Sequence, residues 1–419
     1  MFSIRRAGIP SFVLLFGGAL FMLLVSFASP GIAADRSTVS FRTVEVGSPG
    51  NPSVSIVPFT DAIYETCADA PEGSNCMDIG DVDYRYGIGR LEITVGQWVK
   101  FLNKVDPKGR NRHRLYAKTQ SSGSWPEYGQ VNKKGKARPG RKYRVASSTW
   151  STKPYAFATF LSAARLANSL YNGTLISKKK RSSDGFKYVD YKVRLSRTTE
   201  RGMYNLRNKS ATRSKKQGFV VPSQDEWTKA AYFDPEGGGT FSWWKYPTNA
   251  GVFGDGDATA PNVSVLDNNT GNVTNSADQP VANFRETSLP APSWCPAIAQ
   301  TSDGCSTTNP FGMSPTTYAK VYQASVGTVG TAGTPSPWGT LDQGGNAVEW
   351  TDTITPPPFG LEGKGRVWRR LHGGISNSTA YQMWPSAVGL QPQDNVFYAR
   401  TYPWLGIRIG VVGNLKVKN

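Results

Sequence analysis

The sequence contains very little histidine and cysteine, with two and four residues respectively in a chain of 419. Two histidines cannot supply a facial-triad iron site together with its supporting chemistry. The sequence also lacks the signatures of phosphate-binding loops, dinucleotide-binding turns and zinc sites, and it shows no internal repeat. Nothing in it therefore indicates a nucleotide-dependent or zinc-dependent enzyme.

Only one long apolar run is present, and it lies at the start of the chain. Arg5 and Arg6 precede this run over residues 12–28, and small residues follow at 31–34. Basic residues, an apolar stretch and a small-residue cleavage site in that order are typical of a secretory signal peptide. We predict a signal peptide over residues 1–34 and a secreted or periplasmic protein, with no stable membrane span after cleavage. The alternative is an uncleaved anchor, because the run approaches spanning length.

The four cysteines form two pairs that are close in sequence, Cys67 with Cys76 and Cys295 with Cys305. In an exported protein such pairs favour two disulfide bonds, each closing a short loop. Neither pair has the C-x-x-C spacing of many zinc and redox sites, so metal binding by these thiols is disfavoured.

The formal charge of +18 is concentrated in two segments. Residues 108–150 contain 12 Lys and Arg residues against one acidic residue, and residues 178–217 contain 14 against three. Each segment has a net charge of +11, so the rest of the chain is about −4. We interpret both segments as basic insertions in a less charged body. Such runs are typical of solvated loops, but they also suit an anionic partner: polysaccharide, lipid headgroup or nucleic acid.

The sequence predicts a few helices and strands between long irregular segments. Helices are expected near Thr94 and Ser223, each with a capping-box partner three residues later, and over residues 156–170, where Asn172-Gly173 ends the helix. Short strands are expected over residues 40–66, 83–93 and 405–412 and around Val367-Trp368. Residues 234–337 are rich in Gly, Asn, Asp, Pro and Thr, which predicts long loops. These features indicate an α+β fold in a single domain over residues 35–419.

Several sequence blocks occur in an order that resembles the formylglycine-generating enzyme family, also called sulfatase-modifying factors. The blocks are Tyr86–Thr94 with Phe101–Asn103, Ala163–Gly173, Phe219–Trp227 with Ala230-Ala231, Trp338–Trp350, His372–Gly374 and Leu405–Arg408. The resemblance covers roughly residues 40–412 without the basic insertions. It implies a C-type-lectin-like fold with few helices, short strands and much irregular loop.

The resemblance also implies a structural calcium site in residues 339–350. Its ligands would be the side chains of Asp342 and Glu349 and the main-chain carbonyl oxygens of Gly345 and Ala347. Oxygen donors on a glycine-bearing loop suit Ca²⁺, which binds roughly six to eight oxygens in flexible geometry. The alternative is an ordinary turn with solvated acidic side chains. A second calcium site is expected, by a looser match, at Asn262, Val263 and Asn272.

The family's oxidase chemistry would lie just after the turn at His372. Oxidase members hold copper(I) there with two cysteines five residues apart, and soft thiolates are good ligands for that ion. In this chain the aligned positions are Ser378 and Met383. One thioether is a weak ligand, so neither copper nor formylglycine-generating activity is expected, and we interpret His372 as a turn residue. A hydrolase site that joins His372 to Ser376 or Ser378 has no supporting nucleophile elbow.

Residues 377–404 are rich in aromatic and amide side chains. The resemblance implies that this region forms a ligand-facing surface, and a composition of aromatics and amides suits binding. The candidate surface residues are Asn377, Tyr381, Trp384 and Tyr402. The alternative is that Trp384, Phe397, Tyr402 and Trp404 are buried in the core.

The leading hypothesis is an exported, calcium-stabilised sulfatase-modifying-factor-like domain that binds a protein or anionic glycan and lacks oxidase activity. One alternative is an active copper or non-haem-iron oxidoreductase of the same superfamily. Another is a binder of anionic polymers through the basic insertions. The export signal and the lack of a recognised nucleic-acid motif argue against nucleic acid as that polymer.

Overall fold

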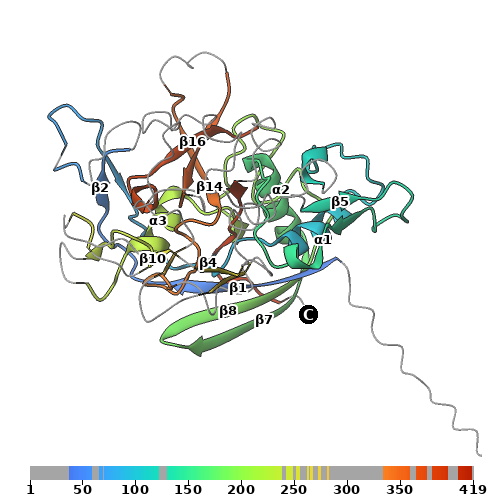
Figure 1. The fold of residues 1–419 in the computed structure, drawn as a ribbon, viewed down its shortest axis with the longest axis horizontal. Helices are drawn as coiled ribbons and strands as arrows, with labels where there is room; N and C mark the ends of the chain where they lie inside the picture. Colours follow the sequence, from blue (N-terminus) through green and yellow to red (C-terminus); the bar gives the residue numbers. More distant parts are fainter. Residues whose placement is uncertain are drawn as a thin grey trace, which may run out of the picture. The chain divides into compact units, whose positions relative to one another are not determined.

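Two larger β-sheets, four two-stranded ribbons and three α-helices make up the regular structure of the described residues (Figure 1). The structure is a computed structural model. It describes residues 37–58, 66–68, 70–121, 130–237, 242–248, 252–254, 262–263, 265–267, 272–274, 281–282, 334–358, 365–374, 380–394 and 404–417. All of them belong to one unit, Arg36–Asn419.

The larger sheet has six antiparallel strands and joins distant parts of the chain. Its spatial order is β7 (Thr174–Ser183), β8 (Phe186–Arg194), β1 (Thr38–Val46), β4 (Tyr86–Gly89), β18 (Gly410–Val412) and β9 (Gly218–Val220). The strand predicted over residues 83–93 is the shorter β4, and the strand predicted over 405–412 is divided between two sheets.

The second sheet has four strands and carries the expected calcium loop. Its order is β16 (Gly389–Pro392), β15 (Trp368–His372), β14 (Val348–Thr355) and β17 (Leu405–Gly406), with β17 parallel to β14. In this register Glu349 lies between His372 on β15 and Gly406 on β17.

The remaining strands form ribbons, accompanied by short 3₁₀ turns. The ribbons are β2 (Val54–Ile56) with β3 (Met77–Ile79), β5 (Val131–Lys133) with β6 (Tyr143–Val145), β10 (Asn262–Val263) with β13 (Val281–Ala282), and β11 (Val265–Asp267) with β12 (Asn272–Thr274). The 3₁₀ turns are η1 (Lys118–Gln120), η2 (Ser148–Trp150) and η5 (Ala380–Met383).

The three helices begin at caps, as the sequence indicates. Thr94 caps α1 (Val95–Val105) and Ser223 caps α3 (Gln224–Tyr232), each in the predicted capping box. Helix α2 (Phe160–Tyr171) begins four residues later than predicted because Thr159 and Ser162 form a third capping box, and it ends at Asn172 as predicted. A capping side chain satisfies a helix N–H that has no partner inside the helix, so it fixes where the helix begins.

The second basic segment is not a loop over its first half, because it forms β7 and β8. Asp184 and Gly185 connect the strands with φ values of 54° and 79°, which suit a tight hairpin turn. Strand β8 then pairs with β1 from Thr38 to Val44, so the basic hairpin is part of the larger sheet (Figure 1). The first basic segment contains the β5–β6 ribbon.

The apolar residues of the helices form the core rather than a binding surface. Trp98, Phe101 and Leu102 of α1 are fully buried with Phe160 of α2 in the largest core cluster. A second cluster gathers around Trp227 of α3. The apolar face of α1 is therefore part of the core.

The described residues are mostly β-structure with few helices and much irregular backbone, consistent with the predicted α+β class. None of their helices combines the length and apolar character needed to cross a bilayer. The predicted signal peptide lies outside the described residues, as do Cys295 and Cys305. Cys67 and Cys76 are joined in the predicted disulfide, with Cα atoms 5.8 Å apart.

Candidate functional site

The expected calcium loop turns sharply just before β14. Asp342, Gly345 and Asn346 have φ values of 59°, 80° and 62°, in the left-handed region. The Gly345 N–H donates a 2.6 Å hydrogen bond to the carbonyl oxygen of Gly373, which ties this loop to the turn after β15. The loop therefore delivers Glu349 into the interior, where it is 0% exposed.

Glu349 forms a buried ion pair with Arg408 that joins β14 to the segment before β18. Arg408 Nη2 lies 2.6 Å from Glu349 Oε1, and Arg408 Nε lies 2.8 Å from Oε2. Trp227 Nε1 donates to Oε2 over 2.7 Å. Arg408 also donates to the carbonyl oxygens of Gly89 and Leu341, so both partners of this buried pair are well satisfied.

Glu92 and Asp342 complete a buried charge cluster with Glu349 and Arg408. Asn346 Nδ2 donates to Glu92 Oε1 over 2.8 Å, whereas Glu92 Oε2 lies 4.0 Å from Arg408 Nη2, too far for a hydrogen bond. Within the described residues, neither Glu92 Oε2 nor Asp342 Oδ2 has a hydrogen-bond partner, although both atoms are buried. Three carboxylates and one guanidinium give the cluster a formal charge of −2 when all are ionised.

The pKa values in the cluster reflect burial first and neighbouring charge second. Burial raises the pKa of Glu92 well above its usual value, Asp342 and Glu349 raise it further, and Arg408 opposes them. Burial also raises the pKa of Asp342 to about 7, with Arg408 opposing and Glu349 adding to the shift. Burial alone lowers the pKa of Arg408, but Glu349 and the other two carboxylates leave it raised. The single positive charge of Arg408 is therefore too small to neutralise all three carboxyl groups of the cluster when they are ionised.

This cluster fits a divalent cation in charge and in donor type, since calcium prefers oxygen ligands. Both oxygens of Glu349 already accept hydrogen bonds, so a cation beside Glu349 would share that carboxylate with Arg408. In the described part of the chain, no group of three or more His, Cys, Asp or Glu side chains has an arrangement that holds a metal ion. A calcium ion would therefore depend on the main-chain carbonyls of Gly345 and Ala347, and the site stays a prediction.

Sequence reasoning missed Glu92 and Arg408 as members of this cluster. Both lie in blocks that carry the family resemblance, which was the available signal. The second expected calcium site is divided between two ribbons, because Asn262 and Val263 pair with β13 whereas Asn272 pairs with β11. The side chains of these three residues lie outside the described part of the structure.

His372 is the last residue of β15, and Gly373-Gly374 form the turn itself, with φ values of 101° and 65°. The imidazole is 1% exposed and stacks on Trp227 with ring centroids 5.1 Å apart. Neither ring nitrogen has a partner among the described atoms. Burial and, to a lesser extent, the charge of Arg370 lower the pKa of His372 to about 3, so the ring is neutral at pH 7.

Of the two positions aligned with the family's cysteines, the structure describes only Met383. Met383 is 0% exposed, and its carbonyl oxygen accepts a 2.7 Å hydrogen bond from the Tyr232 hydroxyl. Ser376 and Ser378 lie outside the described residues.

Among the four residues of the expected ligand surface, the structure describes the side chain of Trp384. Trp384 is partly buried against the Trp227 cluster, with Lys245 Nζ 4.7 Å from its ring centroid, and Trp404 is also partly buried. Asn377, Phe397 and Tyr402 and the side chain of Tyr381 lie outside the described part.

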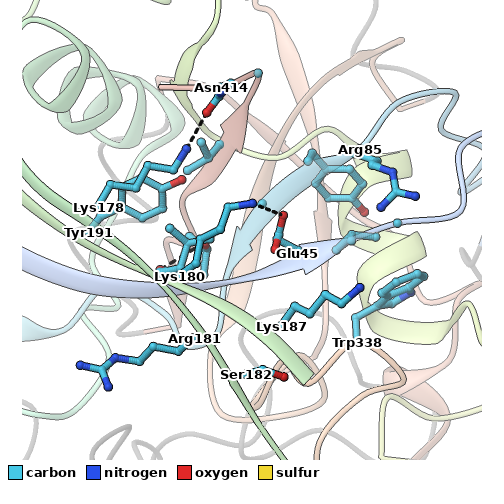
Figure 2. A pocket seen from close by; sticks show the side chains of 18 residues that line it. Glu45, Arg85, Lys178, Lys180, Arg181, Ser182, Lys187, Tyr191, Trp338 and Asn414 are labelled. Carbon is cyan, nitrogen blue, oxygen red and sulfur yellow. Dashed lines mark hydrogen bonds and ion pairs between the residues drawn. The ribbon is translucent and has the colours of Figure 1, made fainter. Parts of the chain in front are cut away.

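A separate hollow of about 890 Å³ lies against one face of the larger sheet (Figure 2). Strands β7, β8 and β1 supply most of its lining, and Arg85, Trp338 and Asn414 come from segments before β4, before β14 and after β18. We call it the sheet-face groove. Its charged lining consists of four cations and one acid, Arg85, Lys178, Lys180, Lys187 and Glu45. Arg181 also borders the groove, but its guanidinium is directed away and pairs with Asp190 on the opposite face of the strands.

The cations of the sheet-face groove are held in different ways. Lys178 Nζ donates to Asn414 Oδ1 over 2.7 Å, and burial lowers its pKa, as does Lys180. Lys180 Nζ lies 3.7 Å from Glu45 in an exposed pair, which contributes little. Figure 2 shows Lys187 directed toward Trp338. Sequence reasoning found the lysines of this basic segment but not the groove.

Comparisons with known proteins place no family on the chain. No protein-family profile and no curated protein matches it. Among solved structures, Treponema denticola variable protein 1 is similar with a TM-score of 0.37 and 12% identity over 90% of this chain and 96% of that one. PvdO from Pseudomonas aeruginosa is similar with a TM-score of 0.35 and 11% identity over 87% and 99%. At TM-scores below 0.5, no residue role or function follows from either.

Proposed function

We propose that this chain is an exported domain of sulfatase-modifying-factor-like, C-type-lectin-like fold that binds an anionic partner and performs no copper-oxidase chemistry. The observation that carries the proposal is the sheet-face groove, which gathers four cationic side chains from three segments against one acidic side chain. Clustered positive charge in a concave site concentrates anions by focusing the electrostatic field. The partner is a protein or glycan with negative charge.

The residues near the His372 turn support the absence of oxidase chemistry. A copper(I) site needs soft, accessible ligands. Met383 is fully buried, and its aligned partner position is Ser378 in place of a cysteine. His372 is buried, neutral and packed on an indole ring, which suits a core residue.

Calcium is proposed as a structural ion at the buried charge cluster. The support is the formal charge of −2 that the cluster carries with all three carboxyl groups ionised, and the two buried carboxylate oxygens without partners, on Glu92 and Asp342. A bound divalent cation would favour the ionised form of both carboxyl groups, because calcium binds carboxylate oxygens.

Two measurements test the proposal. A cysteine-containing peptide is incubated with the purified protein, copper and oxygen, and aldehyde formation is followed by mass spectrometry; no turnover above background is expected. Metal analysis is expected to find calcium. Robust turnover, or stoichiometric iron or copper that is lost on changing His372 or Met383, would overturn the proposal in favour of an active oxidoreductase.

A further inference from the structure

We infer that the sheet-face groove binds an acidic glycan, a chain of sugars that carries carboxylate or sulfate groups. This inference rests on the proposed anion-binding function and adds the place and the chemical class of the ligand. It is carried by three observations: the origin of the cations, their availability, and the neutral groups between them.

Protection of the exposed edge of the sheet against pairing with other chains does not explain all the cations of the groove. Strand β7 is an edge strand of the six-stranded sheet in the described residues, and lysines on such a strand discourage pairing with other chains. That role accounts for Lys178 and Lys180. It does not account for Lys187, which lies on the second strand, or for Arg85, which precedes β4 in the interior of the sheet. Charges from three segments meet at one hollow (Figure 2).

At least three of these cations are available to a ligand. Lys187 and Arg85 are exposed, and neither makes a hydrogen bond or ion pair within the described residues. Lys180 is 71% exposed, and its contact with Glu45 is long. An anionic group can replace such a contact at small cost, because an exposed pair contributes only about 0–1 kcal/mol.

The uncharged residues that line the groove favour a glycan over nucleic acid as the anionic ligand. Ser182 and Asn414 offer hydroxyl and amide groups for sugar hydroxyls, and Trp338 offers a partly buried indole at one end. The Tyr191 ring is 4% exposed because it packs on Phe41 and Phe219. Nucleic acid bound as a single strand needs several open aromatic rings for its bases, and the groove offers only Trp338.

The volume of the groove and the residues around it also favour a glycan, over a single ion and over a membrane surface. A volume of about 890 Å³ lies within the range of sites that enclose small organic ligands, so several sugar units fit where a single ion would leave most of the space unused. Amphipathic sites that insert into a membrane surface carry exposed apolar side chains beside their charges. The exposed large apolar residues of the described chain, Tyr84, Ile354 and Val417, do not line the groove.

The test uses two double variants with equal charge change. Lys180→Gln/Lys187→Gln removes two groove cations. Lys179→Gln/Lys192→Gln removes two exposed lysines from the opposite face of the same two strands. Binding is measured by calorimetry at physiological salt, with an oligogalacturonate as the carboxylated probe, a heparin oligosaccharide as the sulfated probe and a maltooligosaccharide as the neutral control. Melting temperatures of both variants verify folding.

The wild-type protein is expected to bind one or both acidic probes and not the neutral one. The groove variant is expected to bind about tenfold more weakly, the effect of losing roughly 1.4 kcal/mol of charge-assisted contact, and the control variant within about twofold of wild type. Equal loss in both variants would overturn the inference. So would tighter binding of polyglutamate, single-stranded DNA or anionic vesicles than of either acidic glycan. Failure to bind any anion would overturn the proposed function and this inference with it.

Discussion

Replacing His372 with phenylalanine is expected to make the protein more resistant to acid. The imidazole is 1% exposed, packs on Trp227 and has a pKa lowered to about 3 by burial and by Arg370. Protonation of the His372 imidazole is therefore disfavoured in the folded state, whereas in the unfolded chain the imidazole has its ordinary pKa. A phenyl ring keeps the stacking and removes the titrating group.

The magnitude follows from the two pKa values. A histidine with a lowered pKa leaves stability intact above the unfolded value of 6.5, and stability falls as the pH drops from 6.5 toward about 3. At pH 4.5 the loss from His372 is about 2.7 kcal/mol, because each pH unit below 6.5 contributes about 1.36 kcal/mol. The difference in unfolding free energy between the phenylalanine variant and the wild type should therefore rise by that amount between pH 8 and pH 4.5.

Urea denaturation at several pH values, in the presence of a chelator and with the disulfide intact, measures this difference. His113→Phe is the control, because the His113 side chain is 39% exposed and should show a much smaller effect. Since carboxyl groups titrate equally in wild type and variant, the difference isolates the histidine. A difference that is the same at pH 4.5 and pH 8 would refute a buried, neutral His372.

Two further predictions concern buried charge. Excess chelator is expected to lower the melting temperature of the wild type, and Asp342→Asn should abolish this response. In chelator the variant should melt at a higher temperature than the wild type, because it lacks the Asp342 carboxylate oxygen that is buried without a partner. An unchanged melting temperature of the wild type in chelator would contradict the calcium proposal. Arg213→Met should cost about 3–5 kcal/mol of unfolding free energy in urea, because it leaves Glu226 and Asp352 buried without their cation, and a loss below about 1 kcal/mol would contradict this.

The structure also changes how the calcium loop is best tested. Removing the Glu349 carboxylate leaves the Arg408 guanidinium buried without its partner, so Glu349→Ala should destabilise the protein whether or not calcium is bound. Asp342 carries no such pair in the described residues and separates the two effects.

The features predicted correctly from sequence are those fixed by neighbours in the chain. The capping boxes at Thr94 and Ser223 and the helix stop at Asn172 each depend on a few consecutive residues. The β7–β8 hairpin was missed because its lysine-rich strand favoured a solvated loop. The Asp184-Gly185 turn and the alternation of apolar and polar residues from Val189 to Arg194 were the local signals for it.

The contacts that define both candidate sites join residues that are far apart in sequence. Glu349 and Arg408 are 59 positions apart, and Glu92 and Asn346 are 254 apart. Such pairings depend on the order of strands in the two sheets, which no local pattern specifies. The resemblance supplied two of the cluster's acids but not the arginine between them.

The sheet-face groove has a practical consequence because β1, the β7–β8 hairpin, Trp338 and Asn414 build it together. A synthetic peptide copied from residues 178–194 would keep the lysines but lose the other walls. Heat-denatured protein would likewise retain its net positive charge without the cavity. Peptide arrays would therefore report only nonspecific attraction, and comparison of native with denatured protein separates recognition by shape from attraction by charge.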